Sequence, residues 1–278
     1  MAEPALSSTE STSRLAWVTG ASRGIGYAVA RALAADGWVV AVSARNAADL
    51  ETLARECGEL KGEVRPYPLD ITDAFAVSRT FAAIEADLGN VGLAILNAGT
   101  HEPVDGRSFA IAPFRRLMEV NYMGAVNCLA PVVEHFVARG TGRIAVVASL
   151  AGYRGLPTAS AYGASKAALI NMCEALHPEL DAVGVILSVV TPGFVRTQLT
   201  DKNSFPMPFL INADTAARRI VRGLKDDRFE ITFPRRFAFL MKLFRVLPYR
   251  IFFAFTRRIR PMLPKIGGGT PTSRSNLS

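Results

Sequence analysis

The sequence predicts an α/β protein with a doubly wound, mostly seven-stranded parallel sheet and helices on both faces. Short apolar runs alternate with helical patterns along residues 14–233. The runs end in Gly, Asn, Ser or Pro, which is typical of buried parallel strands that end in loops. Alternating strands and helices connect through right-handed crossovers, which place helices on both faces of one sheet.

The expected strands are the apolar runs themselves. They cover residues 14–19, 38–43, 63–67, 92–96, 143–148, 185–190 and 229–233.

The expected helices fill the intervals between these strands. They run from the turn after the first strand to about Asp36, and then over 46–57, 70–88, 113–137, 160–180 and 213–224. Gly37 is a predicted C-terminal cap and Asn46 a predicted N-cap, because glycine and asparagine favour these positions.

The length of 278 residues and the 50% hydrophobic content fit one large α/β domain, or at most two small ones. We expect one main domain at 14–233, a basic amphipathic helical extension at 234–262 and disordered tails at 1–13 and 263–278. The first tail lacks the basic and apolar regions of a signal peptide.

Cysteine and histidine usage predicts no metal site and no disulfide. Cys57, Cys128 and Cys173 form no C-x-x-C pair, and the three histidines lack metal-ligand spacing. Such cysteines are typical of reduced thiols in a cytoplasmic protein.

The net charge of +8 is concentrated at the C-terminal end. Residues 231–278 contain ten Lys and Arg and no Asp or Glu, so residues 1–230 carry a net charge of −2. This asymmetry predicts a local anionic partner and argues against a body that binds nucleic acid.

A glycine-rich turn follows the first strand and opens a helix. Gly20, Gly24 and Gly26 allow a tight turn and a close approach of the backbone to a pyrophosphate at the helix N-terminus. Their G-x-x-x-G-x-G spacing differs from the common G-x-G-x-x-G pattern, and a glycine turn without a ligand is the alternative. Ser22, Arg23 and Ile25 complete the predicted cofactor turn.

The end of the second strand predicts NADP(H) in preference to NAD(H). A site for NAD places an acidic residue there, whereas this chain has Ser43 and Arg45 and no carboxylate. Arg45, with Arg23 as a second clamp and Ser43 as a hydrogen-bonding group, suits a 2′-phosphate. The alternative is a solvated surface arginine.

Tyr162 and Lys166 lie four residues apart, which places them on one face of a helix. An ammonium group beside a phenol favours the phenolate, and the pair becomes a candidate general acid and base. Ser149, upstream, is placed to hold a substrate oxygen. An ordinary helix carrying Tyr and Lys is the alternative for this motif taken alone.

Together these motifs resemble the short-chain dehydrogenases/reductases, which have a Rossmann-like fold. The resemblance spans roughly residues 14–200, and the matching residues occur in the order of the family. They are Thr19 to Gly26, Asp70, Asn97-Ala98-Gly99, Asn121, Ser149, Tyr162, Lys166, Pro192-Gly193 and Thr197.

The resemblance implies a role for each matching residue. Tyr162 transfers the proton, Ser149 orients the carbonyl or hydroxyl, Lys166 binds the nicotinamide ribose, and Asn121 holds a relay water. Asp70 and Ile71 lie at the adenine, although Asp70 is alternatively the N-cap of the next helix. The remaining expected cofactor contacts are Asn97, Ala98, Gly99, Pro192, Gly193, Val195 and Thr197.

The resulting prediction is an NADP(H)-dependent oxidoreductase that transfers a hydride between nicotinamide and a carbonyl or secondary alcohol. The alternatives are a catalytically silent NADP(H)-binding sensor or scaffold and, less favoured because little chain follows residue 200, a sugar-nucleotide epimerase. We expect a hydrophobic substrate against residues 100–110 and 198–212, including Gln198, Phe205, Met207 and Phe209. The resemblance also implies a homodimer or homotetramer.

The segment 234–262 is basic and aromatic, and its pattern predicts two helices separated at Pro248. Its charges argue against a spanning helix, and basic amphipathic helices suit a membrane interface. We therefore expect peripheral contact with a membrane through residues 235–262. The alternative is a lid or subunit contact packed on the body.

Overall fold

The computed structural model describes residues 13–198, 200 and 207–259. The predicted tails, apart from Ser13, lie outside the described residues, as does the expected pocket residue Phe205.

The predicted doubly wound parallel sheet is confirmed. Seven parallel strands pair in the order β3-β2-β1-β4-β5-β6-β9, which reverses direction between β1 and β4. The strands are β1 (Leu15–Thr19), β2 (Val39–Ser43), β3 (Glu63–Pro66), β4 (Leu93–Leu96), β5 (Gly142–Val147), β6 (Val185–Pro192) and β9 (Glu230–Phe233). Each starts within one residue of its predicted position.

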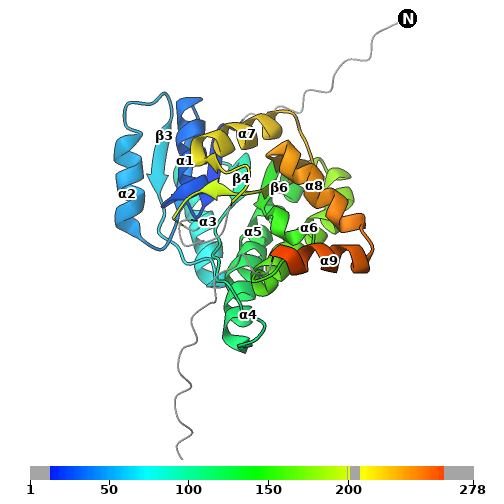
Figure 1. Ribbon diagram of the computed structural model, residues 1–278. Helices are drawn as coiled ribbons and strands as arrows, with labels where there is room; N and C mark the ends of the chain where they lie inside the picture. The colour runs from blue at the N-terminus through cyan, green and yellow to red at the C-terminus, as the bar shows by residue number, and fades with distance from the viewer. Residues whose placement is uncertain (1–12, 199, 201–206, 260–278) are drawn as a thin grey trace, which may run out of the picture.

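Helices cover both faces of the sheet, as Figure 1 shows. One face packs against α1 (Gly24–Ala35), α2 (Ala47–Glu56) and α7 (Ala213–Lys225). The other packs against α3 (Ala74–Leu88), α5 (Gly124–Arg139) and α6 (Ser160–Asp181). Helix α4 (Ile111–Met118) precedes a π-helical turn at Glu119–Met123, and a short 3-10 turn covers Leu150–Gly152.

The strands are buried on both sides because their residues alternate between two cores. In β1, Leu15 and Trp17 belong to one core, and Ala16 and Val18 belong to the other. The indole of Trp17 packs against Phe81 and donates a 3.0 Å hydrogen bond to Ser43 Oγ, so its one polar group is satisfied inside the core.

Strand β3 forms one edge of the sheet and is short and polar. Glu63 and Arg65 are exposed and form an ion pair with 2.7 Å between Nε and Oε1. Pro66, which ends the strand, has no N–H to donate.

Cap positions follow the prediction in two places and depart from it in one. Asn46 accepts a bond from Ala48 N–H at the start of α2, and Gly37 (φ 85°) follows α1. The N-cap of α3 is Asp73, whose side chain accepts from Ala76 N–H. The alternative that Asp70 caps this helix is therefore wrong, because Asp70 instead accepts from Thr72 in a local turn.

Two local features differ from the predicted elements. The single helix expected over 113–137 starts at Ile111 and is interrupted by the π-helical turn. A small parallel sheet, β7 (Val195–Arg196) and β8 (Ile211–Asn212), was not predicted, because two-residue strands carry no periodic pattern.

The C-terminal extension forms two helices, α8 (Arg235–Val246) and α9 (Tyr249–Ile259), on either side of Pro248. Both lie beside α6 at one end of the molecule (Figure 1). Phe237, Met241 and Phe244 of α8 and Phe252 of α9 are buried in the same core as α5 and α6.

Candidate active site

A pocket opens at the carboxyl ends of the central strands, next to the point where the strand order reverses. Ligands bind at this position in open α/β sheets. Ten residues predicted from the sequence line it: Ile25, Asn97, Gly99, Ser149, Tyr162, Lys166, Pro192, Gly193, Val195 and Thr197.

The glycine turn closes so tightly that side chains are excluded. Gly20 and Gly24 have φ values of 68° and 64°, a region that favours glycine. A Cβ on Gly26 would lie 2.4 Å from Gly20 O and 2.5 Å from Asn97 Nδ2, and one on Gly24 would lie 3.1 Å from Thr197 Cγ2.

The turn leaves the start of α1 open to an anion. Arg23 occupies the N-cap position in extended conformation, and no side chain of the described residues caps the helix there. Its first N–H groups are thus available to a pyrophosphate, which the helix dipole also favours. This turn fits the phosphates of a dinucleotide.

Asn97 ties the glycine turn to the end of β4. Its Nδ2 donates to Thr19 O and Gly20 O, both at 3.1 Å. Thr19 Oγ1 in turn accepts from the backbone N–H groups of Asn97 and Ala98. A Cβ on Gly20 would lie 2.6 Å from Ala98 Cα, so the two turns are in direct contact.

Ser149 and Tyr162 meet at the pocket. Ser149 Oγ accepts from Ala151 N–H at 3.1 Å and lies 3.4 Å from Pro192 O. Burial raises the pKa of Tyr162, and its hydrogen bond with Ser149 lowers that pKa by a smaller amount. In the structure the net shift is upward, which differs from the lowering expected from the Lys166 ammonium.

Lys166 is buried behind the tyrosine, with its side chain 4% exposed. Its Nζ donates to Val147 O at 2.9 Å and lies 5.9 Å from the centroid of the Tyr162 ring. Burial lowers the pKa of Lys166 to about 8. The amine therefore titrates close to neutral pH, which suits a group that takes part in proton transfer.

Asn121 lies in the π-helical turn and is fully buried. Its Oδ1 accepts from Thr100 N–H at 2.7 Å, and its Nδ2 donates to Thr100 O and Ser165 Oγ, both at 3.0 Å. A Cβ on Gly99 would lie 3.1 Å from Asn121 Oδ1 and 3.4 Å from Lys166 Nζ, so the amide and the amine flank the same strand end. Single π turns occur frequently at functional sites.

The residues predicted at the adenosine end lie at the ends of β2 and β3. Arg45 is exposed, and its positive charge contributes to the lowered pKa of Asp70, whose largest cause is the bond from Thr72 N–H. Arg23 donates to Gln198 Oε1 at 2.8 Å.

Two predicted cofactor residues have buried side chains. Ser43 is 1% exposed and its hydroxyl accepts from Trp17, so its side chain points into the sheet and does not favour contact with a 2′-phosphate. Ile71 packs into the core, where a Cβ on Gly124 would lie 2.4 Å from its Cδ1. Ile71 is therefore limited to backbone contacts.

Several residues at the site were missed from the sequence. Val147 and Ala148 line the pocket, and Ser165 links Asn121 to the carbonyl of Tyr162. Thr100 and Thr200 also line it, and both fall within the segments 100–110 and 198–212 that were expected at the substrate. The ring of His101 lies edge-on to that of Tyr162, 4.7 Å between centroids, and burial lowers its pKa. Val147 and Ala148 precede Ser149, and Ser165 precedes Lys166. These positions beside motif residues were the available signal that they belong to the site.

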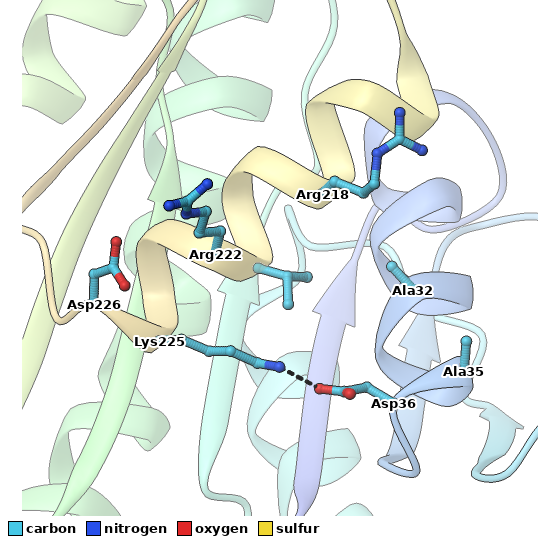
Figure 2. Close-up of a pocket in the computed structure, with 8 residues that line it drawn as sticks. Ala32, Ala35, Asp36, Arg218, Arg222, Lys225 and Asp226 are labelled. Carbon is cyan, nitrogen blue, oxygen red and sulfur yellow. Dashed lines mark hydrogen bonds and ion pairs between the residues drawn. The ribbon is translucent and has the colours of Figure 1, made fainter.

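A second depression lies on the surface of the helical layer that contains α1 and α7, between these two helices (Figure 2). Arg218, Arg222 and Lys225 line it, and Lys225 bridges it through a 2.7 Å ion pair with Asp36. None of the predicted site residues lines this depression, which is open to solvent.

The comparison with protein families identifies the class of this protein. The short chain dehydrogenase family model matches residues 14–206. The chain therefore belongs to this family, and it is an oxidoreductase of a class that uses a nicotinamide cofactor.

Individual relatives agree with this assignment. An uncharacterized oxidoreductase of Myxococcus xanthus is 36% identical over 251 residues, which cover 90% of this chain and 99% of the relative. The ketoacyl reductase HetN of Nostoc is 31% identical, over 80% of this chain and 79% of the relative. Among solved structures, an alcohol dehydrogenase of Thermococcus sibiricus complexed with 5-hydroxy-NADP superimposes with a TM-score of 0.69 at 27% identity, covering 79% of this chain and 95% of that one.

Proposed function

We propose that the protein is an NADP(H)-dependent oxidoreductase that interconverts a hydrophobic carbonyl compound and its secondary alcohol. The observation that supports this most strongly is the meeting of Ser149 and Tyr162 at a pocket whose rear wall holds Lys166. When bound, the nicotinamide supplies or accepts the hydride.

Each residue of the pocket has a distinct part in this proposal. Ser149 and Tyr162 donate hydrogen bonds to the substrate oxygen, where negative charge develops during reduction. Tyr162 then gives its proton to that oxygen. Lys166 would hold the nicotinamide ribose and supplies the proton that restores the phenol, and Asn121 holds the water that completes the relay.

The proposed cofactor preference depends on the end of β2. Arg45 is exposed there, and residues 43–46 contain no carboxylate to repel a 2′-phosphate. The Thermococcus relative in complex with an NADP derivative supports the same choice. Asp70 lies within the field of Arg45 and is proposed to contact the adenine ring.

The proposed substrate is apolar because exposed aromatic side chains surround the expected pocket loops. Phe109 is 70% exposed and packs against Phe114, with 4.9 Å between ring centroids. Phe209 is 47% exposed and lies against Phe237. The name of the ketoacyl reductase among the relatives supports a carbonyl substrate.

The catalytic proposal is tested by Tyr162→Phe. Loss of the proton donor removes general acid catalysis, which contributes roughly 10²–10⁴-fold in rate. We expect NADPH oxidation with a panel of aldehydes and ketones to fall by at least about 10²-fold, while NADPH binding by fluorescence is unchanged. Turnover close to wild type would exclude Tyr162 as the acid and base.

The cofactor proposal is tested by Arg45→Ala, with Arg65→Ala on β3 as an exposed control. A charge-assisted contact with phosphate contributes roughly 1.5–3 kcal/mol, so we expect NADPH affinity to fall about tenfold or more and NADH affinity to stay the same. An unchanged ratio of the NADPH and NADH affinities would show that Arg45 does not contact the 2′-phosphate.

The alternative is a catalytically silent NADP(H)-binding sensor or scaffold. Such a protein has no chemical need for Asn121, Ser149, Tyr162 and Lys166 together. It would bind NADPH in the fluorescence assay and leave it unoxidised with every carbonyl tested, which separates the two functions.

The proposed setting is the cytoplasm, with peripheral contact at a membrane and assembly into a homodimer or homotetramer. No helix among the described residues has the length and apolar character needed to cross a bilayer.

A further inference from the structure

The helices α8 and α9 have two apolar faces. The inner face, formed by Phe237, Met241, Phe244 and Phe252, is buried against the body. Eight further large hydrophobic side chains of residues 239–255 are exposed. The helices are therefore packed on the body, which was the alternative to membrane contact. This packing covers the inner face and leaves the eight exposed side chains in contact with solvent.

Exposed apolar side chains gather on the side of α8 that faces away from its buried residues. On α8 they include Phe239 (74% exposed), Leu243 and Val246 (75% exposed), which fall within one arc because they are spaced by three or four residues. On α9, Ile251 is 57% exposed, whereas Phe253 and Phe255 point to different sides of the helix, because residues two apart do not share a face, and Phe255 packs against the buried Phe244. Apolar surface of this extent on one pair of helices marks an interaction site.

The cations of the helix pair divide into two groups. Lys242 forms an ion pair with Glu230, and Arg245 lies 3.8 Å from Glu174, so both anchor α8 to the body. Arg235 and Arg236 on α8, and Arg250, Arg257 and Arg258 on α9, are exposed and form no ion pair within the described part of the chain. The outer face therefore combines apolar side chains with unneutralised positive charge.

We infer that the outer face of α8, defined by Phe239, Leu243 and Val246 with the arginines of α8 and α9, docks on an anionic lipid surface. Phenylalanine and leucine enter the boundary between headgroups and acyl chains, and each Lys or Arg near an anionic leaflet adds about 1 kcal/mol. The proposal names the face and separates it from the inner one.

A second copy of the chain fits this face less well. A two-fold contact would place the same surface patch of each copy against the other. Arginines of like charge would then face each other, and residues 231–259 contain no acidic residue to pair with them. An anionic lipid surface neutralises the same charges.

The helix that carries the docked face adjoins the candidate active site through its inner side. Phe237, on the inner side of α8, stacks on Phe194 with 5.5 Å between centroids, and a Cβ on the pocket residue Gly193 would lie 2.8 Å from its ring. Docking would therefore hold the pocket near the lipid surface, where an apolar carbonyl compound is concentrated. This last step rests on the proposed oxidoreductase activity, whereas the docking itself, which specifies the proposed membrane contact, does not.

Vesicle flotation tests the docking with the full-length protein. We expect binding to vesicles containing phosphatidylserine and none to vesicles of phosphatidylcholine alone, with the bound fraction falling as salt rises. In the double variant Phe239→Ser/Val246→Ser, affinity for the anionic vesicles should fall at least about tenfold, because each apolar side chain contributes about 1.5 kcal/mol or more on burial.

The matched control is Phe75→Ser, which removes a side chain of equal exposure (71%) from α3 and should leave vesicle binding unchanged. Circular dichroism and NADPH oxidation check that each variant is folded, since none of these residues lines the pocket. Absence of wild-type binding to anionic vesicles, or equal binding by the double variant, would overturn the proposal. So would a double variant that changes from dimer to monomer in light scattering while vesicle binding persists. A protein without turnover that still binds vesicles would contradict only the proposed oxidoreductase activity.

Discussion

At the scale of single residues, the site differs from the simple picture of a lysine that acidifies a tyrosine. Burial acts on both side chains in the direction of the neutral form, so it raises the pKa of Tyr162 and lowers that of Lys166. Ser149 is the neighbour that opposes the shift of Tyr162. A neutral phenol is the form that a reductase needs, because it must donate a proton.

The buried amine predicts a specific dependence of stability on pH. The pKa of Lys166 falls from 10.5 in a model compound to about 8 in the folded protein, so between these values the unfolded chain binds more protons. Below pH 8 the buried ammonium of Lys166 lowers the free energy of unfolding. This destabilisation is relieved as pH rises from about 8 towards 10.5, so the free energy of unfolding increases over that range.

Lys166→Met isolates this contribution from those of other titrating groups. We expect the variant to be more stable than wild type near pH 7 and the difference to shrink as pH rises from 8 to 10, measured by urea unfolding. A difference that stays constant over this range would show that Lys166 is not desolvated. Lys61→Met, at an exposed lysine outside the ion pairs of the described residues, is the control.

The type and position of most site residues could be predicted because they follow strand ends. Their orientations could not. Ser43 was expected at the cofactor, but it lies on the same face of the sheet as Trp17. Its hydroxyl accepts the hydrogen bond of the Trp17 indole N–H, which has to find a partner inside the core. Only the pairing of β1 with β2 shows that the indole of Trp17 and a cofactor would compete for this hydroxyl.

At the scale of elements, the site depends on contact between two strand-ending turns. The turn after β1 and the turn after β4 are in contact, and a Cβ on Gly20 or Gly26 would collide with Asn97 or its neighbours. The sequence predicted both turns. The π-helical turn at Asn121 was not predictable, because one inserted residue hardly changes the apolar periodicity of the surrounding helices.

Gly26→Ala tests this contact. The added methyl group would lie within 2.5 Å of Gly20 O and Asn97 Nδ2, so the turns must separate. We expect a loss of about 1–3 kcal/mol in the free energy of unfolding and at least about tenfold weaker NADPH binding. Gly106→Ala is the control, since its Cβ would meet nothing within 4 Å. Equal behaviour of the two variants in urea unfolding and NADPH titration would contradict the packing argument.

At the scale of the whole molecule, Arg154 joins the C-terminal extension to the segment between Ser149 and Tyr162. Its guanidinium donates to Arg245 O and Leu247 O, both at 3.3 Å, at the end of α8. It also lies over the rings of Tyr249 and Phe252, 4.5 and 4.7 Å from their centroids. The sequence predicted the two helices and the break at Pro248. It could not predict this attachment, because Arg154 is separated from α9 by about a hundred residues.

Arg154→Ala should loosen the extension while leaving the sheet intact. Loss of two hydrogen bonds and two cation–π contacts predicts a destabilisation of about 1–3 kcal/mol, confined largely to α8 and α9. Hydrogen exchange measured by mass spectrometry should rise in residues 235–259 and stay unchanged in β1 and β4. Arg79→Ala, which removes an exposed cation–π contact on α3, is the control. Unchanged exchange in the extension would show that Arg154 does not hold it.

The polar edge at β3 bears on how the folded protein avoids fibrous self-association. A strand from another molecule that approached this edge would meet the charged pair Glu63 and Arg65 and then Pro66, which offers it no amide hydrogen. Growth of the sheet by recruitment of further chains is thereby discouraged on this side. Concentrated solutions of the folded protein should consequently resist amyloid-like stacking through β3.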